Sequence, residues 1–299
     1  MGLINEASLQ RVGEMENANR LELGELLSYA ECPVPLPETD DLELLRNQTL
    51  SKHWRRESLS YYPSSQRLLG TSELARGQHQ QLKEILHSHS QRALNWLATE
   101  IPQYSEGITV HQVGFHPYEE ATRQRPSDQR KDLLGIEQPP SGSMQSWRWL
   151  RILVNLDRER ECAWMTSDTF ATLLSKHGDK VGFPNAEGRW NHSIRRAIPR
   201  WFSKGTLEEE GERFLRRFRQ LLQRDDEVQE KSPRRICRFP SGAAWMLMTD
   251  GLSHGVLRGQ QVLDVGVLVS PDVLQLPHKA PGALLRARLD SNSDARRAA

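Results

Sequence analysis

The chain has 299 residues, 37% of them hydrophobic and 26% charged, so it can form a sizeable core and does not have the composition of a disordered protein. Its 40 lysines and arginines nearly balance 39 aspartates and glutamates, which argues against a generally basic binder of nucleic acids or membranes. Cys32, Cys162 and Cys237 form no CxxC pair, which excludes a zinc ribbon, and their odd number favours a reducing compartment. No signal peptide is evident, and no stretch approaches the ~20 apolar residues that span a bilayer. We therefore expect a soluble, cytoplasmic protein.

The first hundred residues predict one long helix after a loop-rich region. Residues 1–20 are polar and predicted to be poorly ordered, and the prolines that follow limit any strand there to a short one at a sheet edge. Residues 38–71 are loop-rich, with a turn signal at Pro63. Apolar residues at helical spacing predict a helix from about 71 to 101. His89 lies on its apolar stripe, where we expect a packed, hydrogen-bonded histidine rather than a metal ligand.

The later part of the chain is rich in strand patterns. Strand-like runs cover residues 108–116, 147–156, 236–239, 244–249 and 262–269. Helices are predicted at 168–176, capped by Ser167 or Asp168, and at 206–223, where Thr206 and Glu209 match a capping box.

This order of elements predicts an α+β protein, an antiparallel sandwich or barrel decorated by helices. We expect residues 21–290 to form a single domain and residues 291–299 to be a frayed tail. The long polar connection at 119–146 has the length typical of an active-site segment.

No GxGxxG, Walker A, HExxH or GxSxG signature is present. The informative stretch is residues 238–260, which contains an FPxGxxW turn, a strand, a D-x-x-S-H-x-x-x-x-G-Q segment and then a further apolar strand. It looks like the C-terminal half of a double-stranded β-helix, in which the histidine at the start of a late strand, here His254, is a metal ligand. This stretch resembles the Kdo hydroxylase family, which are bacterial iron(II)- and 2-oxoglutarate-dependent oxygenases that hydroxylate the Kdo sugar of lipopolysaccharide.

The resemblance extends upstream and covers about residues 20–290. The strand Trp-Leu-Arg-Ile-Leu-Val-Asn-Leu at 149–156 is similar to a strand of the family, and residues 163–170 are similar to the segment that follows it. Counted back from the matched Arg151, the family's His-x-Asp pair falls on Gly135-Ile136-Glu137. Glu137 keeps a carboxylate that can bind iron, whereas Gly135 has no ligating atom.

The resemblance implies a double-stranded β-helix (jelly-roll or cupin-like) core and a hydroxylase that uses iron(II) and 2-oxoglutarate. Glu137 and His254 would bind the metal, with no catalytic residue beyond these ligands. Arg151 would bind 2-oxoglutarate, because a guanidinium pairs bidentately with a carboxylate. The implied substrate is a Kdo-containing lipid or sugar, and the implied location is the bacterial cytoplasm, including the inner face of the inner membrane with at most peripheral membrane contact.

The anchor of 2-oxoglutarate has other candidates. Arg148 lies on the same predicted strand as Arg151, but alternation sends the two side chains to opposite faces. Arg258 lies in the turn that follows His254. Many oxygenases carry the anchoring base about ten residues after the distal histidine, and here that position is Asp264.

The glycine at 135 leaves two readings of the function open. With glycine in place of one histidine, a facial triad of two histidines and one carboxylate is incomplete. Metal affinity should therefore fall unless His111 or His116 supplies the missing ligand. Alternatively, the chain is a non-catalytic relative that keeps the fold and binds a sugar or a partner without iron chemistry.

Two basic regions carry further hypotheses. A run at 195–204 with nearby aromatic residues would suit a nucleic-acid face, although a solvated helix edge accounts for it, and we expect no nucleic-acid partner. Arg123, Arg125 and Arg130 in the long loop could meet the carboxylate or phosphates of a substrate.

Overall fold

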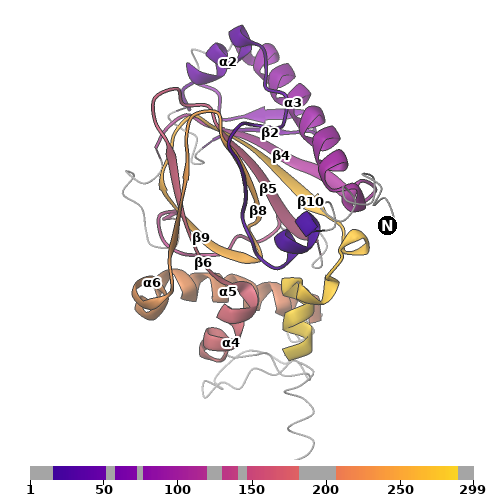
Figure 1. Cartoon of the computed structure of the whole chain (residues 1–299), viewed down its shortest axis with the longest axis vertical. Coiled ribbons are helices and arrows are strands. Elements are labelled where there is room, and N and C mark those ends of the chain that lie inside the picture. Colours follow the sequence, from indigo (N-terminus) through magenta and orange to yellow (C-terminus); the bar gives the residue numbers. More distant parts are fainter. Residues whose placement is uncertain are drawn as a thin grey trace, which may run out of the picture.

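The computed structural model describes residues 16–51, 58–72, 77–119, 130–140, 147–181 and 207–288. Within these ranges two antiparallel sheets curve around a common interior (Figure 1). The larger sheet has the spatial order β1 (Leu27–Tyr29), β8 (Ala244–Met248), β5 (Arg148–Asn155), β10 (Val262–Val269), β4 (Ile108–His116), β2 (Leu59–Tyr62) and β3 (Arg67–Leu69). The smaller sheet has the order β7 (Arg235–Phe239), β6 (Cys162–Thr169) and β9 (Leu252–Arg258).

Helices cover the outside of both sheets (Figure 1). Before β4 lie a helical stretch at residues 16–22 and the helices α2 (Thr39–Arg46), α3 (His79–Glu100) and the short η2 (Pro102–Tyr104). Between β6 and β7 the chain inserts α4 (Phe170–Val181), α5 (Leu207–Arg224) and α6 (Asp226–Lys231). The turns η5 (Pro271–Val273) and η6 (Pro277–Lys279) follow β10.

The side chains of strand β5 alternate between the hydrophobic core and the cavity that lies between the two sheets. Residues two apart on a strand share a face. Leu150, Ile152 and Val154 are buried in the core cluster that includes apolar residues of α3. The alternate residues, Arg151 and Leu153, face the interior between the sheets.

A second apolar cluster attaches the inserted helices to the smaller sheet. Phe214, Phe218 and Leu222 recur every four residues on α5 and are fully buried. They share a cluster with Leu134 and Ile136, so α5 holds the segment that carries Gly135 and Glu137. Figure 1 shows α4, α5 and α6 beneath β6 and β9.

The structure confirms the α+β, antiparallel architecture, and β4 and β10 cover the predicted residues 108–116 and 262–269. The described residues of region 38–71 hold more regular structure than expected, because they contain α2 and the β2–β3 hairpin. The turn predicted at Pro63 closes that hairpin, with the Gln66 amide donating to the Pro63 carbonyl.

Three boundaries differ from the sequence prediction. Helix α3 begins at His79, not near residue 71. Helix α4 begins at Phe170 because β6 continues to Thr169, and the Thr169 hydroxyl, not Ser167 or Asp168, accepts from a first-turn amide. Residues 16–22 are helical, so regular structure begins before the expected limit at residue 20.

Several predicted features lie outside the described residues. They are the Thr206 cap, the basic run at 195–204, the loop arginines Arg123 and Arg125, and the tail at 291–299.

Candidate metal and anion site

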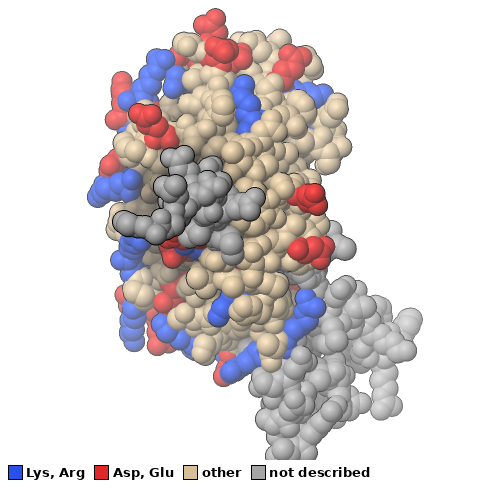
Figure 2. Space-filling model, turned by 45° about the vertical axis from the view of Figure 1, so that its right-hand side comes forward, with Lys and Arg blue, Asp and Glu red and all other residues tan. Residues whose placement is uncertain are grey.

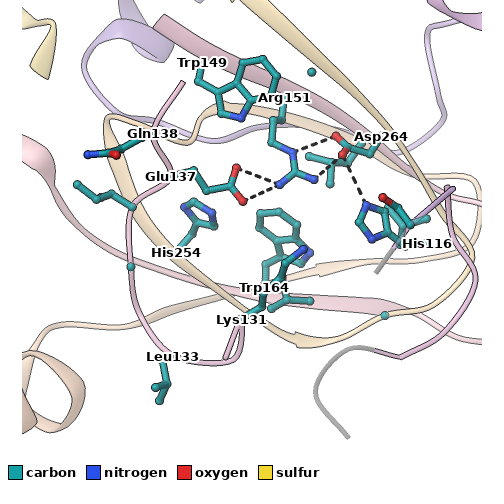
Figure 3. Close-up of a pocket in the computed structure, with 18 of the residues that line it drawn as sticks. His116, Lys131, Leu133, Glu137, Gln138, Trp149, Arg151, Trp164, His254 and Asp264 are labelled. Atoms are coloured by element: carbon teal, nitrogen blue, oxygen red, sulfur yellow. Dashed lines mark hydrogen bonds and ion pairs between the residues drawn. The ribbon is translucent and has the colours of Figure 1, made fainter. Parts of the chain in front are cut away.

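A cavity of about 540 Å³ lies between the two sheets. Its walls include Arg151 of β5, His254 of β9 and Glu137 of the segment between β4 and β5 (Figure 3). The structure therefore brings the three residues singled out in the sequence into one cavity, although their roles stay predictions.

A short backbone pairing places Glu137 beside His254. The Gly135 amide donates to the His254 carbonyl at 3.1 Å, and the His254 amide donates to the Gly135 carbonyl at 2.9 Å. Residues that exchange both bonds are directly opposite, so their side-chain positions share one face. Figure 3 shows the side chain of Glu137, two residues further on, next to that of His254.

Backbone hydrogen bonds hold the segment that carries Glu137 against β9 and against Thr249, which follows β8. The Val256 amide donates to the Lys131 carbonyl at 2.7 Å, and the Glu137 amide donates to the Thr249 carbonyl at 2.9 Å. Gly255 permits this close approach, since a Cβ there would lie 3.1 Å from the carbonyl oxygens of residues 132 and 133. The position of the carboxylate is therefore fixed by backbone contacts.

His254 has the protonation state that a metal ligand requires. Its Nδ1 lies 2.9 Å from the Leu252 carbonyl oxygen, which can only accept, so Nδ1 carries the proton and Nε2 keeps its lone pair. Burial lowers the pKa of His254, which favours the neutral imidazole. The Trp164 indole stacks on the ring with 5.5 Å between centroids and so restricts its rotation.

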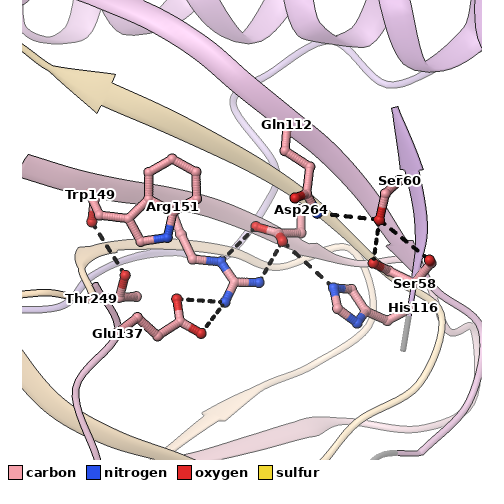
Figure 4. A network of polar contacts seen from close by, with 9 residues as sticks. All are labelled: Ser58, Ser60, Gln112, His116, Glu137, Trp149, Arg151, Thr249 and Asp264. Carbon is pink, nitrogen blue, oxygen red and sulfur yellow. Dashed lines mark hydrogen bonds and ion pairs between the residues drawn. The ribbon is translucent and has the colours of Figure 1, made fainter. Parts of the chain in front are cut away.

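Arg151 joins two carboxylates across the cavity (Figure 4). Its Nη1 is 2.9 and 3.0 Å from the two oxygens of Glu137, and its Nε is 3.0 Å from Asp264 Oδ1. Burial raises the pKa of Glu137, but the neighbouring basic groups, with Arg151 the strongest of them, together outweigh burial and hold the pKa well below its ordinary value. Burial also raises the pKa of Asp264, but its contacts with Arg151 and His116 together lower it below its ordinary value. Both carboxylates are therefore ionised.

The structure separates Arg151 from the other candidate anchors. Arg148 is fully buried away from the cavity, with its Nε 2.7 Å from Asp250 Oδ2. Arg258 is exposed and paired with Glu161. Asp264, which stands where many oxygenases have a basic residue, instead holds Arg151 from the neighbouring strand.

Neither alternative histidine stands beside His254. His116 Nε2 is 3.6 Å from Asp264 Oδ2, and Figure 3 shows it on the side of Asp264 away from His254. His111 packs edge-on against Tyr62 and Trp149. The geometry thus gives no support to either as the missing ligand.

The donors present suit iron(II), which is bound in many oxygenases by imidazole and carboxylate groups with positions left open. His254 and Glu137 supply one of each. A further oxygen, Gln223 Oε1, is buried and has no hydrogen-bond partner among the described residues, and its side chain lines the same cavity. Sequence reasoning missed Gln223, because nothing in its local pattern links the end of α5 to residue 135.

A separate cluster of possible metal ligands lies outside this cavity. The described residues His177, Asp225 and Glu227 have ligating atoms within 4.8 Å of one another. The Lys180 ammonium is 2.6 Å from Asp225 and 2.9 Å from Glu227 and already forms an ion pair with each carboxylate. The cluster of His177, Asp225 and Glu227 is therefore a weaker candidate for the iron site than the cavity.

Among the charged residues that line the described part of the cavity, cations outnumber carboxylates. Arg130, Lys131 and Arg219 line it in addition to Arg151, whereas its acidic groups are Glu137 and Asp264. On the outer surface in Figure 2, basic and acidic side chains are interspersed. With four cationic and two acidic side chains on its described wall, the cavity suits an anionic ligand.

Among the described residues, no helix has the length and apolar character needed to cross a bilayer.

Comparison with known proteins identifies the family. The model of the 3-deoxy-D-manno-oct-2-ulosonic acid (Kdo) hydroxylase family matches residues 5–292. The apo structure of the Kdo hydroxylase KdoO, a non-heme Fe(II) alphaketoglutarate-dependent dioxygenase, is 22% identical with a TM-score of 0.77, over 94% of this chain and 91% of that chain. The KdoO complexes with alphaketoglutarate and Fe(III) and with cobalt(II) have the same identity and coverage, with TM-scores of 0.76.

No curated protein sequence matches the chain. The likeness to KdoO confirms the oxygenase-type double-stranded β-helix expected from the sequence. Since the family model covers nearly the full length, this chain belongs to the Kdo hydroxylase family.

Proposed function

We propose that this chain is an iron(II)- and 2-oxoglutarate-dependent hydroxylase of a Kdo-containing lipid or sugar. Membership of the Kdo hydroxylase family supports the reaction and the substrate class. The observation that carries the site assignment is the pairing of Gly135 with His254, which sets Glu137 beside the imidazole at the cavity.

His254 and Glu137 are the residues that hold the metal. When bound, iron(II) would use dioxygen and 2-oxoglutarate to convert a C–H bond of the sugar to C–OH, with 2-oxoglutarate leaving as succinate and carbon dioxide. The backbone bonds of the 131–137 segment keep Glu137 in place, and the Leu252 carbonyl keeps His254 in the required tautomer.

Arg151 is the residue that receives the carboxylate of 2-oxoglutarate. Its guanidinium has five N–H donors, and the contacts with Glu137 and Asp264 do not use all of them. Asp264 holds the guanidinium from the side away from Glu137, so it remains oriented when it exchanges part of its contact with Glu137 for the co-substrate (Figure 4).

The acidic sugar is attracted by the remaining cations of the wall. Lys131 and Arg219 line the cavity and lower the pKa of Glu137, after the larger effects of burial, Arg151 and His254. Arg130 also lines the cavity but is paired with Asp132. A carboxylate or phosphate of the substrate is expected to lie near Lys131 and Arg219.

The test is anaerobic addition of iron(II) and 2-oxoglutarate, read by the visible metal-to-ligand charge-transfer band. We expect a band in the native protein, its loss in His254→Ala, and its retention in His278→Ala, which removes an exposed histidine at η6. Absence of the band in the native protein, together with no decarboxylation of 2-oxoglutarate, would refute the proposal and leave the non-catalytic relative as the better description.

A further inference from the structure

Gly135 leaves an opening beside the proposed metal ligands. Its backbone is paired with His254, so a side chain at 135 would start on the same face as the imidazole. A Cβ at this position would lie 3.5 Å from Gln223 Cγ and 3.6 Å from Gln223 Nε2. The side chain of Gln223 therefore lies against the space that Gly135 leaves.

A structural tie keeps Gln223 in this place. The side-chain nitrogen Nε2 of Gln229 on α6 donates to the backbone carbonyls of Leu134 and Leu222, both at 2.8 Å. The Leu134 amide in turn donates to Gln229 Oε1 at 3.0 Å. Leu134 and Leu222 immediately precede Gly135 and Gln223, so one glutamine fixes the two positions relative to each other.

The side-chain oxygen of Gln223 lacks the partner that burial requires. The residue is 7% exposed, and its Oε1 is buried without a hydrogen-bond partner in the ranges that the structure describes. Such an atom costs about 1–3 kcal/mol unless something binds it. Because the side chain lines the cavity that holds His254 and Glu137, a metal bound by these two residues would supply that partner.

The chemistry of the amide agrees with this role. A carbonyl oxygen is a neutral donor, as a histidine imidazole is. Replacing imidazole by amide therefore keeps the charge of a site with one carboxylate and two neutral ligands. An oxygen donor is weaker than imidazole for iron(II), so the site keeps three protein ligands but binds the metal less tightly.

We infer that Gln223 Oε1 is the third protein ligand of the metal, in place of the side chain that Gly135 lacks. This inference rests on the proposed function, since it requires His254 and Glu137 to bind a metal.

The test measures cobalt(II) binding by calorimetry and by the visible spectrum, with no turnover required. Gln223→Met keeps the length of the side chain but removes the oxygen, and we expect at least about tenfold weaker binding, since even loss of an outer-shell partner costs about 10–100-fold. Gln223→Glu restores an oxygen and should bind at least as tightly as the native protein. Gln220→Ala, an exposed glutamine on the same helix, is the matched control and should not change the affinity.

A second arm moves the ligand back to position 135. The double variant Gly135→His/Gln223→Ala provides an imidazole and the room for it, and should bind cobalt(II) more tightly than Gln223→Ala alone. The metal-free Gln223→Met protein should melt no lower than the native protein, because the substitution removes an unpartnered buried oxygen.

The outcomes separate the inference from the proposed function. Native affinity in Gln223→Met, with the native protein binding cobalt(II), overturns the role of Gln223 alone. No cobalt(II) binding by the native protein overturns both. Loss of binding in Gln223→Met but not in Gln223→Glu supports the inference.

Discussion

Replacing Arg151 by lysine tests the centre of the site with the smallest change of charge. The guanidinium contacts Glu137 through Nη1 and Asp264 through Nε and Nη2, so its fork spans two carboxylates on different elements. A lysine has one ammonium group and cannot reproduce both contacts together with a third to 2-oxoglutarate. We expect Arg151→Lys to fold but to bind 2-oxoglutarate poorly.

The magnitude follows from the contacts that are lost. A hydrogen bond to a charged group contributes about 1.5–3 kcal/mol, and every ~1.4 kcal/mol changes an affinity tenfold. The loss of one bidentate carboxylate contact should therefore weaken 2-oxoglutarate binding by about 10–100-fold. Stability should also fall, since one ammonium group cannot contact Glu137 and Asp264 together and one of these carboxylates loses its hydrogen-bonded partner.

The assay is a titration of the cobalt(II)-loaded protein with 2-oxoglutarate, followed by tryptophan fluorescence because Trp149 and Trp164 line the cavity. Arg148→Lys is the matched control: it changes the same residue type on the same strand and also disturbs a buried carboxylate pair, but it lies on the opposite face. Unchanged affinity in Arg151→Lys, or an equal loss in Arg148→Lys, would show that Arg151 is not the anchor.

Three further predictions concern the surrounding structure. Arg148→Met should cost about 3–5 kcal/mol in urea unfolding because it leaves Asp250 buried and unpaired, and Arg148→Met/Asp250→Leu should recover most of this; a double variant as unstable as the single one would contradict the reasoning. Burial lowers the pKa of His89 from 6.5 to about 3, so the folded state resists protonation and the free energy of unfolding should fall by up to about 1.4 kcal/mol per unit as pH drops from 6.5 towards 3. His89→Leu should flatten this slope, and an unchanged slope would refute the assignment. Gly255→Ala should weaken cobalt(II) binding, because its Cβ pushes against two carbonyls of the segment that carries Glu137; native affinity would show that the segment is not held by this contact.

The sequence predicts best where local pattern alone determines the structure. Strands β4 and β10 are rich in β-branched residues, and their observed bounds agree with the prediction. The sequence predicts too early a start for helix α4 because Ser167 and Asp168 look like caps, whereas pairing of Thr169 with Leu252 keeps both residues in β6. His89 was expected to be packed, and it is 1% exposed in the described structure.

The site required information that local pattern does not contain. Alternation on β5 predicts that Arg148 and Arg151 diverge, and they do. The Arg151–Asp264 contact was not predicted, because it depends on β5 and β10 being neighbours across more than a hundred residues. Gln223 was missed for the same reason, since its relation to Gly135 arises only when α5 packs on the smaller sheet.

The helices inserted between β6 and β7 have a consequence for how this family can change. Helix α5 contributes Gln223 and Arg219 to the cavity wall, while the strands contribute His254 and Arg151. The described residues of these helices take no part in the strand pairing of the two sheets, although α5 also packs on the segment that carries Glu137. A substitution at an α5 position that lines the cavity, such as Arg219, would therefore change the charge that a bound sugar meets while the register of the strands stays the same.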